Sequence, residues 1–107
     1  MPVQFPVVLW PLVELVQRHA YAQPDRAIEA ARQLLKHCTQ PEHLAFVYEQ
    51  LGFAHLILGE HRLSSLFYEQ AAKAQPPTVY VLANWAHALF ELGERERAVA
   101  TGRAALA

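Results

Sequence analysis

The sequence predicts an all-α fold built from three antiparallel helix pairs. Alanine, leucine, glutamate, glutamine and arginine dominate from residue 12 onward, and glycine occurs only four times in 107 residues. No stretch shows the two-residue alternation of a half-buried strand. Prolines and glycines divide the chain into segments of helical length with short linkers, which make consecutive helices pack as antiparallel neighbours. The expected helices cover about residues 11–22, 24–38, 41–58, 60–75, 77–92 and 94–106.

Each expected helix boundary has a local signal. Pro24 opens the second helix, and residues 39–42 have the Thr-x-x-Glu spacing of a capping box, with proline in the first turn of the third. Gly59 and Gly93 each follow a leucine and precede a glutamate, as expected where a helix ends at a left-handed residue. The Pro76-Pro77 pair ends the fourth helix and starts the fifth.

The first ten residues predict an extended apolar arm, and residues 11–107 a single domain. Residues 1–13 carry no charged side chain, but they lack the basic start of an export signal, and three prolines interrupt any apolar helix. The run also falls short of the roughly 20 apolar residues that a membrane helix needs. We therefore expect no membrane association, and the apolar arm needs cover from elsewhere.

Net charge bears on the class of partner, and cysteine content bears on the cellular compartment. The formal net charge is −1, which removes the global electrostatic argument for a nucleic-acid binder. A single cysteine, Cys38, cannot form a disulfide within the chain and is typical of a reducing compartment. The sequence therefore predicts a cytoplasmic protein without a nucleic-acid partner.

The chain repeats itself with a period of 34 residues from about residue 45 onward. A shift of 34 places residues 58–60, Leu-Gly-Glu, on residues 92–94, which have the same sequence, and Ala54 on Ala88. Such a period is typical of helical repeat arrays, in which each unit covers the apolar face of the next.

These residues resemble the tetratricopeptide repeat (TPR) family, whose unit is a 34-residue helix-turn-helix. Residues 45–78 match the family's order of large, small and terminal proline positions, with Tyr48, Leu51, Gly52, Ser64, Tyr68, Ala71 and Pro76. Residues 79–107 form a truncated unit, and residues 11–40 a divergent first one. The resemblance implies that the helix pairs stack as a right-handed superhelix, a solenoid. Within each unit the paired helices are expected to approach closely at Gly52 and Ala86.

The resemblance also implies that the functional surface is the concave groove formed by the first helix of each unit. The residues expected to line it are Phe46, Glu49, Phe53, Leu56, Tyr80, Ala83, Asn84, His87 and Phe90, with Ile57 and Glu91 at the same helical spacing. Burial in the core between units is the alternative for the three phenylalanines. A subset of the family binds C-terminal carboxylates, which Glu49 and Glu91 would repel. We therefore expect an apolar or amphipathic segment as the occupant.

No pattern in the chain predicts an enzyme, a metal site or a cofactor. None of the six histidines has the i, i+4 spacing of a helical metal site, and no phosphate-binding loop or nucleophile elbow is present. A cysteine-histidine site formed by Cys38 with His37 or His43 is the remaining catalytic alternative.

The expected function is that of a non-catalytic protein interaction module, an adaptor, scaffold or chaperone that binds another protein. The alternative is that the chain is the N-terminal part of a longer TPR scaffold. The third unit ends without the polar capping helix that repeat arrays usually have. Together with the apolar residues 3–10, this uncovered end predicts self-association, most simply as a homodimer.

Overall fold

The computed structural model describes residues 4–107 and confirms the all-α prediction. A short 3₁₀ helix, η1 (Val7–Leu9), precedes six α-helices, and no strand occurs among the described residues. The helices are α1 (Trp10–His19), α2 (Pro24–Leu35), α3 (Pro41–Ile57), α4 (His61–Ala74), α5 (Val79–Glu91) and α6 (Arg95–Leu106). The second helix ends earlier than expected because residues 36–38 form three-residue backbone turns in place of a further α-turn.

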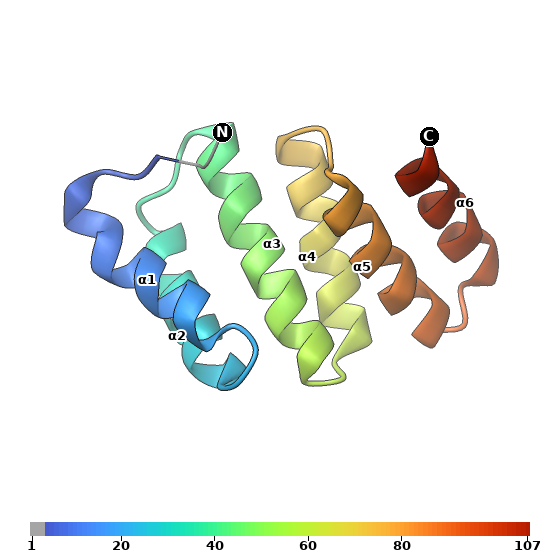
Figure 1. Cartoon of the computed structure of the whole chain (residues 1–107), viewed down its shortest axis with the longest axis horizontal. Coiled ribbons are helices and arrows are strands. Elements are labelled where there is room, and N and C mark those ends of the chain that lie inside the picture. The colour runs from blue at the N-terminus through green and yellow to red at the C-terminus, as the bar shows by residue number, and fades with distance from the viewer. Residues whose placement is uncertain (1–3) are drawn as a thin grey trace.

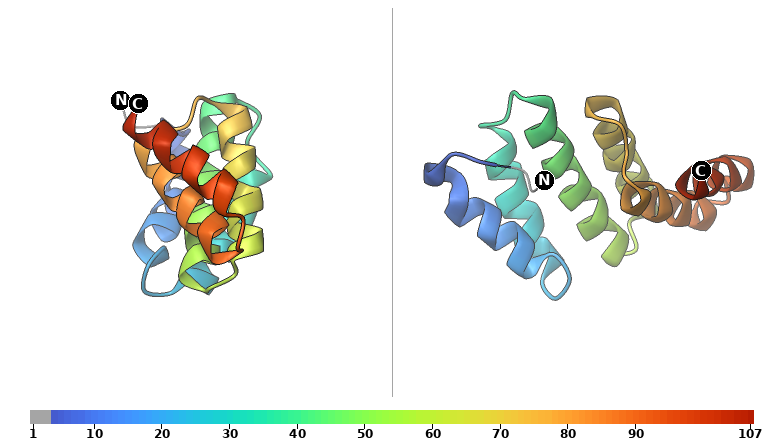
Figure 2. Two further views of the ribbon diagram at one scale, coloured as in Figure 1. Left: turned by 90° about the vertical axis from the view of Figure 1, so that its right-hand side faces the viewer. Right: turned by 45° about the horizontal axis from the view of Figure 1, so that its top comes forward.

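The helices form three consecutive pairs along the longest axis of the molecule (Figure 1). Each helix packs against the next one in the sequence, and α3 also contacts α5, the corresponding helix of the following pair. The molecule is elongated, 42 Å by 26 Å by 19 Å. The right-hand view of Figure 2 shows α1/α2 and α5/α6 at opposite ends, with α3/α4 between them.

One apolar core joins the first two helix pairs. Val16, Leu34 and Val47, from α1, α2 and α3, are fully buried in one cluster that joins the first two pairs. Leu89 is fully buried on α5. Burial of this kind supplies most of the favourable free energy of folding.

Two turns adopt the predicted left-handed conformation. Gly59 has a φ of 75° and Gly93 a φ of 83°, and the residue after each closes a backbone bond onto the preceding helix. The predicted capping box at residues 39–42 is wrong. Pro41 is the first residue of α3, so Gln40 is the N-cap and Thr39 falls outside the helix; no side chain caps this end.

The predicted extended arm is partly wrong, and its first three residues lie outside the described part. Val7–Leu9 is a 3₁₀ turn that leads directly into α1. Phe5 is buried, and its backbone oxygen accepts a hydrogen bond of 2.9 Å from Nε1 of Trp10. The arm is thus folded back against the domain, which gives part of its apolar surface the cover that it needs.

The arm docks on the N-terminal half of α3. The ring of Phe5 stacks on His43 with 4.3 Å between centroids and meets Phe46 edge-on at 5.4 Å. Nε2 of His43 lies 2.7 Å from the backbone oxygen of Gln4, so this nitrogen carries the donated proton. One aromatic anchor and one buried hydrogen bond hold the arm in place.

Candidate functional site

A hollow of about 270 Å³ opens where α3 and α5 face each other, next to the end of α1; we call it the α3/α5 hollow. It is lined by Ala20, Glu49, Gln50, Phe53, Tyr68, Tyr80, Val81 and Asn84. These residues come from four helices and helix ends that the array brings together, and α3 and α5 contribute most of them. The hollow therefore lies on the face where the first helices of neighbouring pairs meet.

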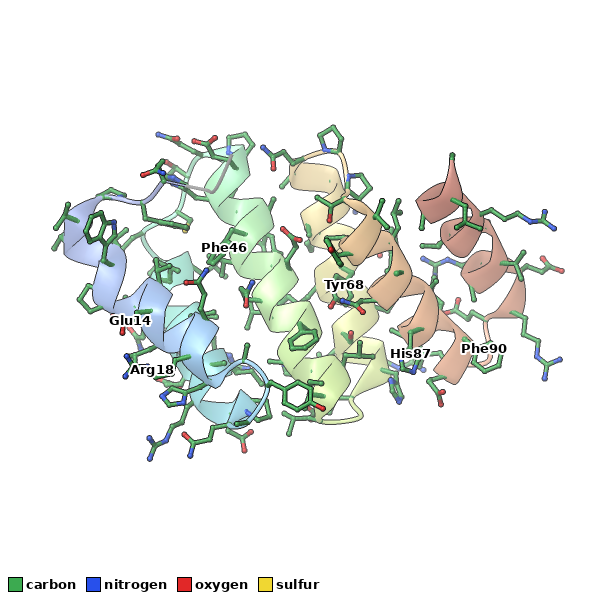
Figure 3. The ribbon with its side chains drawn as sticks, viewed as in Figure 1. Glu14, Arg18, Phe46, Tyr68, His87 and Phe90 are labelled. Carbon is green, nitrogen blue, oxygen red and sulfur yellow. The ribbon has the colours of Figure 1, made fainter. Side chains whose placement is uncertain are left out.

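Tyr68 reaches this hollow from α4 because Gly52 leaves room for its ring. A Cβ atom at Gly52 would lie 3.0 Å from Cζ and 3.1 Å from both Cδ atoms of Tyr68, so the face of the ring covers the glycine. Oγ of Ser64 donates a hydrogen bond of 2.8 Å to the backbone oxygen of Gly52 and holds the two helices together. Figure 3 shows Tyr68 in the middle of the molecule, between α3 and α5.

The buried polar groups of the hollow are incompletely paired. Tyr68 is only 1% exposed, and its hydroxyl has no hydrogen-bond partner among residues 4–107. Burial raises the pKa of Tyr68, a weak hydrogen-bonding interaction with the Asn84 side chain lowers it, and the charge of Glu49 raises it further. Because both neighbours line the hollow, the hydroxyl end of Tyr68 faces it.

Glu49 is the charged residue of the lining. Its side chain is half-buried on α3, and burial raises the pKa of its carboxyl above the ordinary value of 4.5. The hollow consequently contains a partly desolvated carboxyl group, whose charged form burial disfavours.

Aromatic side chains surround this polar centre. Phe53 is half-buried, and its ring lies 6.4 Å from that of Tyr21 in the loop between α1 and α2. Tyr80 at the start of α5 is 81% exposed. The rim of the hollow therefore offers apolar surface that is accessible from outside.

The structure places four of the nine predicted groove residues together in the hollow: Glu49, Phe53, Tyr80 and Asn84. The other five lie elsewhere. Phe46 lies in the N-terminal half of α3, where it is half-buried against Phe5 of the arm. Leu56 is half-buried near the C-terminal end of α3, and Ala83 is exposed on α5.

His87 and Phe90 lie near the C-terminal end of α5, away from Tyr68 (Figure 3). The ring of His87 is 6.2 Å from that of His61 on α4, and its Nε2 lies 3.6 Å from Oε1 of Glu91. Phe90 is 60% exposed. Neither residue lines the α3/α5 hollow, so the face predicted from helical spacing is not one continuous pocket.

Sequence reasoning missed two of the polar residues of this site, Gln50 and Tyr68. Gln50 stands three residues before Phe53, so the helical spacing that selected Phe53 could also have selected it. Tyr68 was expected only as a packing position of the repeat. The hydroxyl of Tyr68 faces the α3/α5 hollow because its ring packs over Gly52 of α3. No pattern within α4 indicates this.

The alternative site around Cys38 lacks an activated thiol. Burial raises the pKa of Cys38, and Sγ donates a hydrogen bond of 3.3 Å to the backbone oxygen of Leu34. A reactive cysteine needs a lowered pKa. His43, one of its two proposed partners, is instead engaged with Gln4 and Phe5.

Residues 4–107 contain no cluster of three or more histidine, cysteine, aspartate or glutamate side chains that could hold a metal ion. Within the same residues, no helix combines the length and the apolar character that crossing a membrane requires.

Replacing Glu49 with glutamine should stabilise the domain at neutral pH. Because the pKa of Glu49 is raised on folding, the folded chain binds more protons, and this residue's contribution to stability falls as pH rises through the raised pKa. We expect Glu49→Gln to gain a few tenths of a kcal/mol at pH 7, since solvent screens a half-exposed carboxyl. Urea denaturation at pH 7 and at pH 4 measures the gain, which should vanish at pH 4. Glu91→Gln, at an exposed position on α5, is the matched control, and an equal gain there would contradict the prediction.

No protein-family model matches the chain, and the search of curated proteins found no relative.

Proposed function

We propose that this protein is a non-catalytic interaction module that binds an apolar or amphipathic segment of another protein. The observation that carries the proposal is the α3/α5 hollow, where exposed aromatic rings border buried, incompletely paired polar groups. Binding sites commonly combine apolar walls with a few polar groups that fix orientation. The occupant lies along α3 and α5, as a helix or as an extended strip.

The repeat pattern supports the same proposal. In the TPR family that the sequence resembles, the first helices of successive units form the concave binding face. The contact between α3 and α5 agrees with this arrangement. We infer that the three pairs stack as a right-handed TPR-like superhelix whose concave side includes the hollow.

Self-association stays a prediction. Val8 in η1 is 81% exposed and Leu106 in α6 is 87% exposed, so apolar surface is available near both ends of the described chain. A homodimer would cover one of these surfaces and leave the α3/α5 hollow open. Light scattering at tens of micromolar protein measures the oligomeric state, and a monomer there would contradict self-association.

Phe53→Ala should weaken partner binding by roughly thirtyfold or more while the domain stays folded. An aromatic anchor of an interface commonly contributes 2 kcal/mol or more, which is roughly a thirtyfold loss of affinity. The experiment captures partners from lysate on immobilised wild-type protein and on the variant, identifies them by mass spectrometry and then measures affinities for the purified partner. Circular dichroism melts establish that the variant is folded.

Two further variants delimit the surface. Leu66→Ala, at an exposed position on α4 outside the lining of the hollow, is the control and should capture the same partners as wild type. His87→Ala tests whether the site extends toward the end of α5. A folded Phe53→Ala protein that binds every partner with unchanged affinity would show that this face is not the binding surface.

A further inference from the structure

We propose that the α3/α5 hollow is a specificity pocket for an arginine side chain of the bound segment. This inference rests on the proposed function, because it names the chemistry of the segment that the same face binds. Four polar groups lie together in the hollow: the carboxylate of Glu49, the amides of Gln50 and Asn84, and the buried hydroxyl of Tyr68. The aromatic rings of Phe53 and Tyr80 lie at its rim.

The size of the hollow favours a single side chain. Its volume of about 270 Å³ lies below the roughly 300–1,000 Å³ of pockets that enclose whole small molecules. It is open toward the outside between α3 and α5, so a segment lying along these helices can insert one side chain into it.

Charge complementarity selects a cation. Glu49 supplies the negative charge of the lining, and none of the lining residues is basic. Other glutamates of this protein have partners within the chain: Glu14 pairs with Arg18, and Glu94 pairs with Arg97 at 3.1 Å. Glu49 is instead partly buried, and this burial raises the pKa of its carboxyl. An incoming cation would supply the counter-charge that this carboxylate lacks.

The incompletely paired Tyr68 hydroxyl points to the same kind of ligand. It is buried beside Glu49 and Asn84, and its interaction with the Asn84 side chain falls short of full hydrogen-bond geometry. An unpaired buried hydroxyl has a desolvation cost that a bound donor can remove. A ligand carrying several N–H donors can serve this oxygen, the carboxylate and an amide oxygen together.

Arginine meets these requirements better than lysine does. Its planar guanidinium presents five N–H donors in a fixed fork, which suits a carboxylate together with neighbouring oxygens. The same plane stacks on aromatic rings, and Phe53 and Tyr80 are available for this at the rim. A lysine ammonium is a compact, strongly hydrated charge that uses neither feature.

The test measures binding of small side-chain probes to the full chain by NMR. N-acetylarginine methylamide is titrated into ¹⁵N-labelled protein, and the shifts of the Asn84 and Gln50 side-chain amides are followed. The matched probes are the corresponding derivatives of citrulline, which has the same shape without the charge, and of lysine. We expect saturable shifts with a dissociation constant of about millimolar for the arginine probe. Citrulline and lysine probes should bind at least about fivefold more weakly.

Three variants connect the binding to the named groups. Glu49→Gln should weaken the arginine probe about tenfold and leave the citrulline probe unchanged. Tyr68→Phe should weaken the arginine probe severalfold with little change in the melting temperature, because the hydroxyl that it removes makes no hydrogen bond of full geometry within residues 4–107. Glu91→Gln changes a glutamate outside the hollow and should bind all probes as wild type does.

The outcomes either support or overturn the inference. Equal affinity of the arginine and citrulline probes, unchanged affinity in Glu49→Gln, or no shift up to about 50 mM probe would overturn it. Equal affinity of the lysine probe would overturn the choice of arginine. Partner capture separates this inference from the proposed function. If Phe53→Ala loses the partner while Glu49→Gln retains it, the binding face stands and the arginine pocket fails.

Discussion

Gly52→Leu should destabilise the domain by about 3 kcal/mol or more, the largest effect we expect from one substitution. A Cβ atom at this position already lies 3.0 Å from the ring of Tyr68, and leucine adds three further carbons toward α4. Overpacking a close helix contact costs about 1–3 kcal/mol and more where the neighbour cannot move. Tyr68 is almost fully buried, so its ring can yield only toward the α3/α5 hollow and would lose its packing against α3. The melting temperature should fall by more than about 10 °C.

Gly102→Ala on α6 is the matched control for this substitution. A Cβ atom there would lie 3.8 Å from that of Ala86 on α5, which is an ordinary van der Waals contact. Replacing a helical glycine by alanine with room to spare should stabilise the domain by about 0.5–1 kcal/mol. Thermal melts followed by circular dichroism compare both variants with wild type. If Gly52→Leu melts like the parent, the register of α3 against α4 described above is wrong.

Phe5→Ala should cost about 3 kcal/mol and release the arm from α3. The side chain is 7% exposed and belongs to the cluster that joins the first two helix pairs. Truncating a buried phenylalanine typically costs about 3–5 kcal/mol, and a site at the margin of the core belongs at the lower end. The loss would also leave His43 and Phe46 without the ring that covers them. Urea denaturation gives the free energy of unfolding.

Val8→Ala controls for a general effect of shortening arm side chains. Val8 is 81% exposed, so its truncation should change the free energy of unfolding by less than about 0.5 kcal/mol. Similar costs for Phe5→Ala and Val8→Ala would contradict the docked arm.

Because the arm covers the Phe46 end of α3, Phe5→Ala also tests whether uncovering that end enlarges the binding face. Partner affinity measured on folded Phe5→Ala protein answers this.

Helix content, helix number and turn chemistry could be predicted from the sequence because they depend on neighbouring residues. The left-handed turns at Gly59 and Gly93 need only a residue without a Cβ atom after a helix, and both form as expected. The capping box at residues 39–42 failed for an equally local reason. The helix begins one residue later than the motif requires, because Pro41 occupies its first position.

Helical spacing identified part of the candidate site and could not identify the rest. It selected Glu49 and Phe53 on α3 correctly as neighbours, and both line the hollow. It also grouped His87 and Phe90 with them, but these residues lie too far along α5 to share the same pocket. Spacing within one helix predicts which side chains share a face. It does not predict which residues of a neighbouring helix lie opposite them.

The sequence by itself therefore determined an array of six helices, its turns and the 34-residue repetition, all of which follow from short-range chemistry and period. Only the tertiary structure decided that Phe5 docks on α3 and that the ring of Tyr68 passes Gly52 to bring its hydroxyl beside Glu49 and Asn84. Both depend on contacts between residues that are distant in the chain. The position of the Tyr68 ring depends on how closely α3 and α4 approach, and the docking of Phe5 depends on which part of α3 the other helices leave uncovered. Neither can be deduced from a single segment of the sequence.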